Sequence, residues 1–335
     1  MTDLITVKRV DLVAGPITHD WGKAAADWAK NLKSSRTRRA YLEAWADFLG
    51  FVELTPDQVS QSHVIDYRSH LKTAVSPKTG RPFSQSTVNQ RLSAISSFFG
   101  FAQGRGLRSD NPVEGVAREA VTPYGRATWL DVEAGDDFRL LTVIDPSTPQ
   151  GLRDKAIMLI FLTLGLRVES VARLKVGDLR RQGEVGAFLT VTAKGGRTFD
   201  KRLPAETFKA IDAYLKTRSG DLSPASPLFV ATDRGRAAAR RLGLDVGDED
   251  PLTARQIANL VKTHCNKAFG PGHGIHPHSL RHTAAKAAEV EGFAVTAISD
   301  LLSHRSLNTT VIYMHATARA GDKVADRLGR RYADR

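Results

Sequence analysis

Residues 276–292 read HPHSLRHTAAKAAEVEG, and their spacing predicts a helix with a reactive face. His278 and Arg281 are three residues apart, and His282 is four residues after His278, so the three side chains share one side of that helix. Two histidines at this spacing also occur in zinc sites. The sequence offers no third ligand at metal-site spacing and lacks the acid of an HExxH motif, so zinc is the weaker interpretation.

A second stretch, LLSHRSLNTTVIYMH at residues 301–315, carries His304 and Tyr313 nine residues apart. Two leucines close an apolar helix face before His304, and Asn308 is a typical N-cap for the helix that follows. A tyrosine on such a helix is usually a packing residue. Tyr313 therefore needs support from other parts of the chain before it indicates chemistry.

Two further segments carry reactive residue types. In LGLRVES, residues 164–170, Arg167 follows the most apolar helix of the sequence, where burying an unpaired guanidinium would be costly. An ion pair with Glu169 is the simplest explanation for it. In TAKGGR, residues 192–197, Lys194 lies at the tip of a predicted hairpin, where most lysines face solvent.

Together these segments supply arginines, histidines, a lysine and a tyrosine without a cluster of acids, a set that suits a phosphodiester. Arginine binds two non-bridging phosphate oxygens at once and stabilises charge at phosphorus. A tyrosine hydroxyl can attack phosphorus, and lysine or histidine can protonate the departing oxygen. This chemistry needs no metal, so we expect no cofactor.

Composition narrows the class of protein. The 335 residues are enough for two domains, and 41% hydrophobic content is that of a globular protein. Lys and Arg total 48 against 36 acids, a net charge of +12 that favours nucleic acid as partner. Cys265 is the single cysteine, the first residues do not form a signal peptide, and the apolar run at 156–166 is too short to span a membrane. We therefore expect a cytoplasmic protein with no membrane partner.

The first 120 residues or so have helical periodicity. Tyr41, Trp45, Phe48 and Val52 fall on one helix face, and Ser86 is a candidate N-cap for the helix that contains SAISSFFGFA. Arginines on the opposite faces are either solvated or phosphate contacts. The candidate DNA-binding arginines are Arg36, Arg38, Arg39, Arg81 and Arg91.

The second half mixes helices with a small β region. Thr128 is a candidate N-cap for its first helix, and a buried helix is expected over 153–164. Residues 185–203 alternate in polarity around a Gly-Gly turn, which predicts a β-hairpin. Several helices follow residue 252. The fold class is therefore mainly α with a small β-sheet.

HSLRH at 278–282, followed by LLSHRSLNTTVIYMH, resembles the tyrosine site-specific recombinases, the phage integrase family that includes the Xer proteins and Cre. Arg281 lies 23 residues before His304, and Arg167 lies 114 residues before Arg281, spacings that suit this family. More weakly, TRRAY and SQSTVNQRLSAI in the first half resemble the family's helical core-binding domain.

The resemblance implies a domain plan. Residues 1–17 would be an N-terminal tail, 18–118 a helical, SAM-like core-binding domain, 119–127 a linker, and 128–335 a mixed α/β catalytic domain. It also implies an enzyme that cuts and rejoins strands at a double-stranded DNA recombination site through a 3′-phosphotyrosine, as a homotetramer on DNA. The last helix, roughly 317–332, would contact a neighbouring copy.

The resemblance also implies a role for each site residue. Arg167 and Arg281 would bind the scissile phosphate, Tyr313 would attack it, and Lys194 would be the general acid for the 5′-oxygen. His278 would assist proton transfer from the tyrosine, His304 would hydrogen-bond the phosphate, and His282 would support the site. The family usually has an acid three residues after the first arginine, where this chain has Ser170, with Glu169 one residue earlier.

Three other functions fit parts of the sequence. A type IB topoisomerase-like or telomere-resolving enzyme would share the chemistry. A DNA-binding regulator with a decayed site is disfavoured by the intact set of six residues. A metal-dependent nuclease built on the acidic loop at 243–251 is disfavoured because no acid pair lies near the basic residues in the sequence.

Overall fold

The computed structural model describes residues 20–77, 79–121, 128–182, 186–192, 196–218, 220, 222–231 and 250–303. The chain divides into two compact units, residues 1–122 and 123–335. Each unit has its own hydrophobic core. The predicted finer boundaries, with a tail over 1–17 and a linker over 119–127, stay predictions.

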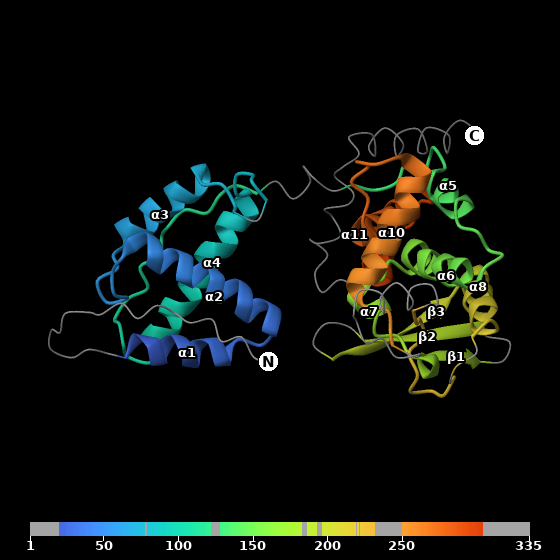
Figure 1. Ribbon diagram of the computed structural model, residues 1–335, viewed down its shortest axis with the longest axis horizontal. Helices are drawn as coiled ribbons and strands as arrows, with labels where there is room; N and C mark the ends of the chain where they lie inside the picture. The colour runs from blue at the N-terminus through green and yellow to red at the C-terminus, as the bar shows by residue number, and fades with distance from the viewer. Residues whose placement is uncertain are drawn as a thin grey trace, which may run out of the picture. The chain divides into compact units, whose positions relative to one another are not determined.

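The described part of the N-terminal unit consists of four helices (Figure 1). They pack around aromatic side chains. Trp28, Trp45 and Phe98 meet at its centre, with ring centroids 3.8 Å apart for Trp45 and Phe98 and 5.5 Å apart for Trp28 and Phe98. Trp45 and Phe48 are buried, as the helical stripe predicted. The helices are α1 (Trp21–Asn31), α2 (Ser35–Val52), α3 (Gln61–Thr73) and α4 (Gln85–Gly104).

The start of α4 corrects the prediction of Ser86 as its N-cap. The helix begins two residues earlier, because the Ser84 hydroxyl accepts the backbone N–H of Thr87 at 3.2 Å. Both serines precede the same apolar stripe, so the sequence alone favoured neither by a large margin.

The C-terminal unit combines a three-stranded antiparallel sheet, in the order β1-β2-β3, with helices. Figure 1 shows the strands below α6 and helices α10 and α11 above the sheet. The strands are β1 (Leu179–Gln182), β2 (Gly186–Thr192) and β3 (Thr198–Leu203). The helices are α5 (Asp136–Thr142), α6 (Pro149–Leu164), α7 (Val168–Val171), α8 (Ala205–Leu215), α10 (Ala254–Phe269), α11 (Pro277–Val290) and α12 (Val295–Leu302).

Helix α6 forms the centre of this unit. It packs against α8 and α11, and its residues are buried around most of its circumference, which explains why its sequence is apolar rather than amphipathic. Arg153 and Asp154 are the buried exceptions. Asp154 accepts the Arg153 guanidinium at 2.7 Å and faces His264 of α10 at 2.9 Å, so the buried charges are paired.

Two predictions for the C-terminal unit need correction, and one is confirmed. The apolar helix begins at Pro149 with Thr148 as N-cap, four residues before the predicted start. Thr128 is not an N-cap: its hydroxyl donates to the Gly274 carbonyl at 3.1 Å and lies 2.7 Å from the Ser279 hydroxyl, which ties this segment to α11. The predicted hairpin is confirmed by the pairing of β2 with β3.

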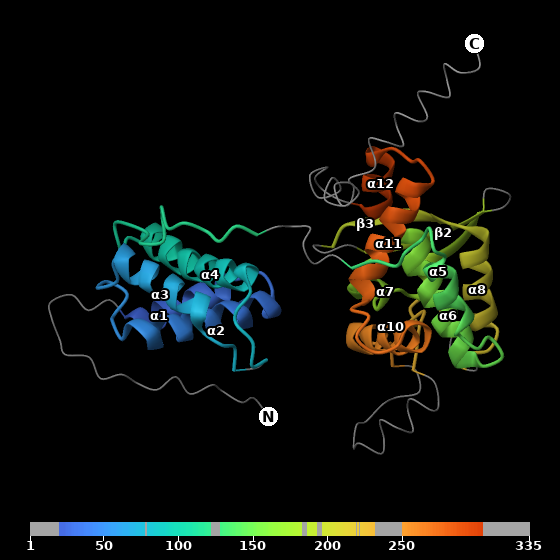
Figure 2. The ribbon, with the colours of Figure 1, turned by 90° about the horizontal axis from the view of Figure 1, so that it is seen from above.

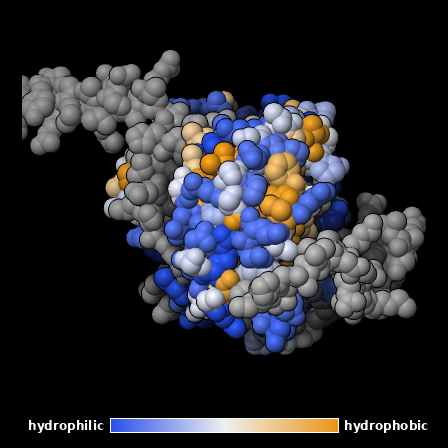
Figure 3. Space-filling model, turned by 90° about the vertical axis from the view of Figure 1, so that its left-hand side faces the viewer, coloured by the Kyte–Doolittle hydropathy of each residue, from blue (hydrophilic) through white to orange (hydrophobic). Residues whose placement is uncertain are grey.

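The surface in one view is mostly polar, as expected when the hydrophobic side chains are buried in the two cores. The face in Figure 3 is largely hydrophilic, with hydrophobic residues in small patches. Across the described part of the chain, no helix combines the length and apolar character that crossing a bilayer requires.

Candidate active site

The end of α6 places Arg167. Gly165 ends that helix in the left-handed conformation, with φ of 57°, and its N–H donates to the Phe161 carbonyl at 3.1 Å. A Cβ at this glycine would lie 2.6 Å from Cδ2 of Leu302, so α12 packs directly over it. The chain then turns outward, and Arg167 is the exposed N-cap residue of α7.

Arg281 reaches the same place from α11. Its side chain is buried, with 2% exposure, and its two terminal nitrogens donate to the main-chain carbonyls of Gly165 and Leu302. These bonds use two of the five N–H groups of a guanidinium. Arg281 therefore links the C-terminal ends of α6 and α12. Figure 2 shows α12 beside α11, the helix that carries Arg281.

His278 lies on the first turn of α11, one turn before Arg281. Its ring lies edge-on to that of His282, with centroids 4.5 Å apart. Loss of surrounding water lowers the pKa of His278, and Arg281, His276 and Arg167 lower it further through charge, while Glu169 opposes them. The structure thus brings Arg167, Arg281 and His278 into one electrostatic neighbourhood, which favours the neutral imidazole.

Ser170 connects α7 with the sheet. Its hydroxyl donates to the carbonyl of Thr192 at 3.2 Å, at the end of β2 and two residues before Lys194. The Arg167 carbonyl accepts the Ser170 N–H at 2.9 Å within the same turn. The residue that replaces the family's usual acid is therefore bonded to the hairpin that carries the predicted general acid.

The start of α11 is fixed by the segment that opens the C-terminal unit. Besides the Thr128 contacts, the backbone N–H of Leu130 donates to the Thr283 hydroxyl at 3.0 Å. The Ser279 hydroxyl also lies 2.5 Å from Nδ1 of His276. Ser279 and Thr283 are both buried and are four residues apart on one face of α11, so this face is bonded to the segment that opens the unit.

Three predicted site residues, Lys194, His304 and Tyr313, lie outside the described residues, as do the Asn308 N-cap and the helix at 317–332. Zinc was the weaker interpretation of the histidine pair. Among the residues that the structure describes, no group of three His, Cys, Asp or Glu could hold a metal ion.

The five candidate DNA-binding arginines fall into two groups. Arg36, Arg39 and Arg81 are exposed, and so is Arg38, which differs from them by its bond within the unit. Arg38 donates to the Ala29 carbonyl at 2.8 Å, and Arg91 pairs with Asp47 and donates to the Tyr67 hydroxyl at 3.2 Å. The structure thus gives Arg38 and Arg91 contacts that hold the N-terminal unit together, and DNA binding by all five stays a prediction.

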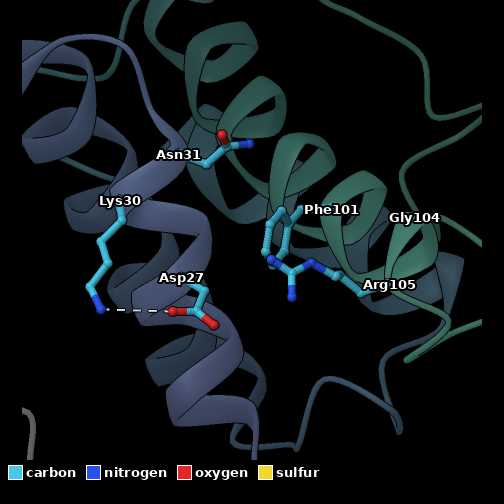
Figure 4. Close-up of a pocket in the computed structure, with 6 residues that line it drawn as sticks. All are labelled: Asp27, Lys30, Asn31, Phe101, Gly104 and Arg105. Atoms are coloured by element: carbon cyan, nitrogen blue, oxygen red, sulfur yellow. Dashed lines mark ion pairs between the residues drawn. The ribbon is translucent and has the colours of Figure 1, made fainter.

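The N-terminal unit also has an open groove of about 630 Å³ between α1 and α4 (Figure 4). Lys30 and Asp27 form an ion pair at 3.8 Å on one wall, and the Arg105 guanidinium lies 5.1 Å from the centre of the Phe101 ring on the other. Asn31 and Gly104 complete the lining. All six lining residues belong to the N-terminal unit, whereas the predicted catalytic residues belong to the C-terminal unit.

Comparison with known proteins matches both units. The profile of the phage integrase family matches residues 135–319, and that of the phage integrase N-terminal SAM-like domain matches residues 29–107. The chain belongs to the phage integrase family. It is a tyrosine site-specific recombinase, an enzyme that breaks and rejoins DNA at a recombination site, as the motifs predicted.

Individual relatives agree with this assignment. Tyrosine recombinase XerC of Pelobacter propionicus is 30% identical over 287 residues, which cover 85% of this chain and 86% of the relative. The XerC of Thermodesulfovibrio yellowstonii is 28% identical over 291 residues, which cover 84% of this chain and 86% of the relative.

Solved structures share the fold. XerH bound to a palindromic difH substrate has a TM-score of 0.65 at 17% identity, covering 86% of this chain and 78% of that one. A lambda integrase dimer on a COC′ core site has a TM-score of 0.63 at 15% identity, and the match covers 89% of this chain and 95% of the integrase chain.

Sequence reasoning missed the positioning role of Gly165. Its signal was present, because a glycine directly after an apolar helix predicts a left-handed C-cap. The close approach of Leu302 could not be predicted, since it depends on how α12 packs.

Proposed function

We propose that this recombinase joins double-stranded DNA sites through a 3′-phosphotyrosine on Tyr313. The observation that carries the proposal is the meeting of Arg167, Arg281 and His278, which are up to 114 residues apart in sequence, around the junction of α6, α11 and α12. Two guanidinium groups beside a neutral imidazole suit a phosphate whose charge grows during attack.

In the proposed cleavage step, the Tyr313 oxygen forms a bond to phosphorus as the bond from phosphorus to the 5′-oxygen breaks. His278 accepts the phenol proton, and Lys194 donates a proton to the 5′-oxygen, so charge is balanced. Arg167, Arg281 and His304 bind the non-bridging oxygens. Ligation is the reverse reaction with the 5′-hydroxyl of another strand, and it needs no ATP because the bond energy is kept in the phosphotyrosine.

The proposed working unit is a homotetramer on two DNA duplexes in the cytoplasm, since exchange of four strands requires four tyrosines. One of the related solved structures is a lambda integrase tetramer bound to a Holliday junction. A type IB topoisomerase-like enzyme would use the same chemistry on one duplex as a monomer. The two are distinguished by whether products join strands from different DNA molecules.

The test of the proposal is Tyr313→Phe on a nicked suicide substrate. We expect the variant to bind DNA with unchanged affinity and to form no covalent protein–DNA adduct, whereas the unmodified protein forms the adduct in the presence of EDTA. An adduct formed by the variant, or wild-type cleavage that EDTA abolishes, would exclude the proposed mechanism.

A second experiment tests Lys194 as the acid. An alkoxide is a poor leaving group because its conjugate acid has a pKa near that of water, about 16, whereas a thiol has a pKa of about 8.5. We expect Lys194→Ala to cleave ordinary DNA slowly and to regain most of its rate on DNA with sulfur in place of the bridging 5′-oxygen. Arg167→Ala should not be rescued, since it acts on the non-bridging oxygens.

A further inference from the structure

The last turn of α12 is bound by two cations from distant parts of the chain. Lys201 of β3 donates through Nζ to the carbonyls of Asp300 at 2.6 Å and Leu301 at 2.8 Å. Arg281 of α11 donates to the next carbonyl, that of Leu302. Three consecutive main-chain oxygens are therefore held by two side chains (Figure 2 shows β3, α11 and α12 together).

Such contacts are favourable at this end of a helix. The last carbonyls of a helix have no partner within it, and the helix dipole places partial negative charge there. The helix has eight residues and ends at Leu302, and its C-cap, Ser303, is in the left-handed conformation with φ of 50°. A helix this short depends on outside contacts for its stability. The Lys201 ammonium supplies one at its end, beside the Ser303 N–H, which donates to the Asp300 carbonyl at 3.0 Å.

An aromatic ring and two charged groups lie near the Lys201 ammonium. Its ammonium lies 5.4 Å from the centre of the Phe199 ring, two residues earlier on the same side of β3. Partial burial lowers the pKa of Lys201, nearby Arg281 lowers it further, and Asp300 opposes both. Two cations are thus held close together, and the carbonyls between them offset their repulsion.

We propose that Lys201 is a positioning residue for strand cleavage, which fixes the C-terminal end of α12 and so the starting point of the segment that carries His304 and Tyr313. His304 follows Ser303 directly in the sequence. This inference rests on the proposed function, because it matters for catalysis only if those two residues act on the phosphate. It assigns Lys201 no contact with DNA and no proton transfer.

The experiment replaces Lys201 by methionine, which keeps the length of the side chain and removes its donors. We expect the single-turnover rate of cleavage at saturating DNA to fall roughly tenfold to a hundredfold, as small displacements of catalytic groups do. DNA affinity should be unchanged. Amide hydrogen exchange should become faster in the peptide that covers Ser299–Ser303. Lys201→Arg, which keeps a charged donor, should recover part of the rate.

The sulfur-bridged substrate separates positioning from acid catalysis. We expect the defect of Lys201→Met to be the same on both substrates, while Lys194→Ala is rescued by sulfur. Rescue of Lys201→Met would identify Lys201 as the acid and overturn the inference. An unchanged cleavage rate, or unchanged exchange in the last turn of α12, would also overturn it.

A matched control is Lys209→Met on α8, where the lysine is exposed and pairs with Glu206 at 2.7 Å. This variant should cleave like the unmodified protein and show unchanged exchange in α12. If Lys201→Met does not fold, Lys201→Leu, which also lacks a donor, provides the same comparison at reduced temperature. Failure of the Tyr313→Phe test would refute the proposed function, whereas a wild-type rate in Lys201→Met with Tyr313→Phe inactive would refute only this inference.

Discussion

Gly165 occupies a position where both the backbone and the packing require glycine. Its φ of 57° is unfavourable for other residues, and the space for a Cβ is filled by Leu302. Its carbonyl accepts the Arg281 guanidinium, and Arg167 is two residues further along the chain. The glycine therefore sets the relation between the two arginines that we expect to bind the phosphate.

Gly165→Ala tests this role. We expect a loss of about 1–2 kcal/mol from the left-handed backbone and a further loss of about 1–3 kcal/mol from overpacking against Leu302. Thermal unfolding measures the total, and cleavage should slow because the arginines move. The matched control is Gly135→Ala, with φ of 78° and nothing within 4 Å of the added Cβ, which should show the backbone loss alone. Equal losses at the two glycines would contradict the packing argument.

The environment of His278 predicts the pH dependence of cleavage. Desolvation and neighbouring guanidinium groups lower its pKa below the ordinary 6.5, so the neutral imidazole that accepts a proton persists at lower pH. At DNA concentrations far below saturation, the rate reports the free enzyme. On the acid side of the pH–rate profile, we expect the rate to reach half of its maximum below pH 6.5. His278→Gln should lose this acid limb of the profile. A limb above 6.5 would show that another group titrates.

At the level of elements, the short helix α7 lies between two predicted catalytic groups in the chain of bonds. Arg167 is its N-cap residue, and Ser170, in its first turn, is bonded to the end of β2. A hydroxyl is smaller than the carboxylate usual in the family and is neutral, so it can bond a carbonyl that a carboxylate would repel. The serine thus couples the position of Arg167 to the hairpin that carries Lys194.

Ser170→Ala should slow cleavage of ordinary DNA about two- to tenfold, the equivalent of a neutral hydrogen bond of about 0.5–1.5 kcal/mol. The reason is a less well placed Lys194, so the defect should shrink on the sulfur-bridged substrate, where that proton is not needed. Single-turnover rates on both substrates measure this. A defect of the same size on the two substrates would mean that the serine acts on Arg167 alone.

Elements with a strong periodic or apolar pattern were the ones that the sequence predicted. The helix with Trp45 and Phe48, the apolar α6 and the β2–β3 hairpin were expected, though α6 and α4 begin earlier than predicted. Strand β1 was missed because its four residues, LRRQ, have no alternation. The motif predicts which arginines form the site, and their roles stay a prediction. The bonds of Ser170 and Lys201 join residues 22 and about 100 positions apart, which no local pattern reveals.

On the scale of the whole molecule, the two hydrophobic cores share no residues. Three of the four tryptophans, Trp21, Trp28 and Trp45, belong to the N-terminal unit, and the fourth, Trp129, belongs to the other. Tryptophan fluorescence therefore reports mainly on the N-terminal unit, whereas far-ultraviolet circular dichroism reports on both.

We expect two separable unfolding transitions. Trp45→Phe or Phe48→Ala should lower the midpoint temperature of the transition seen by fluorescence and leave the midpoint of the other transition unchanged. For Phe48→Ala, we expect the free energy of unfolding of the N-terminal unit to fall by about 3–5 kcal/mol. Phe161→Ala in α6 is the reciprocal control, since it is fully buried in the other core. Parallel shifts of both transitions in every variant would show that the two units unfold as one.

The net charge of +12 predicts that DNA binding depends steeply on salt, because phosphate contacts release counterions. With about six such contacts, the slope of log K against log salt would be near −5.

Two neighbouring arginines make the test specific. Arg39→Ala, at an exposed position, should make the slope less steep by about 0.9. Arg38→Ala removes the donor to the Ala29 carbonyl, so it should lower the melting temperature of the N-terminal unit with a smaller change in slope. A flat dependence on salt would contradict binding through phosphates, and equal slopes for Arg39→Ala and the unmodified protein would remove Arg39 from the DNA-binding surface.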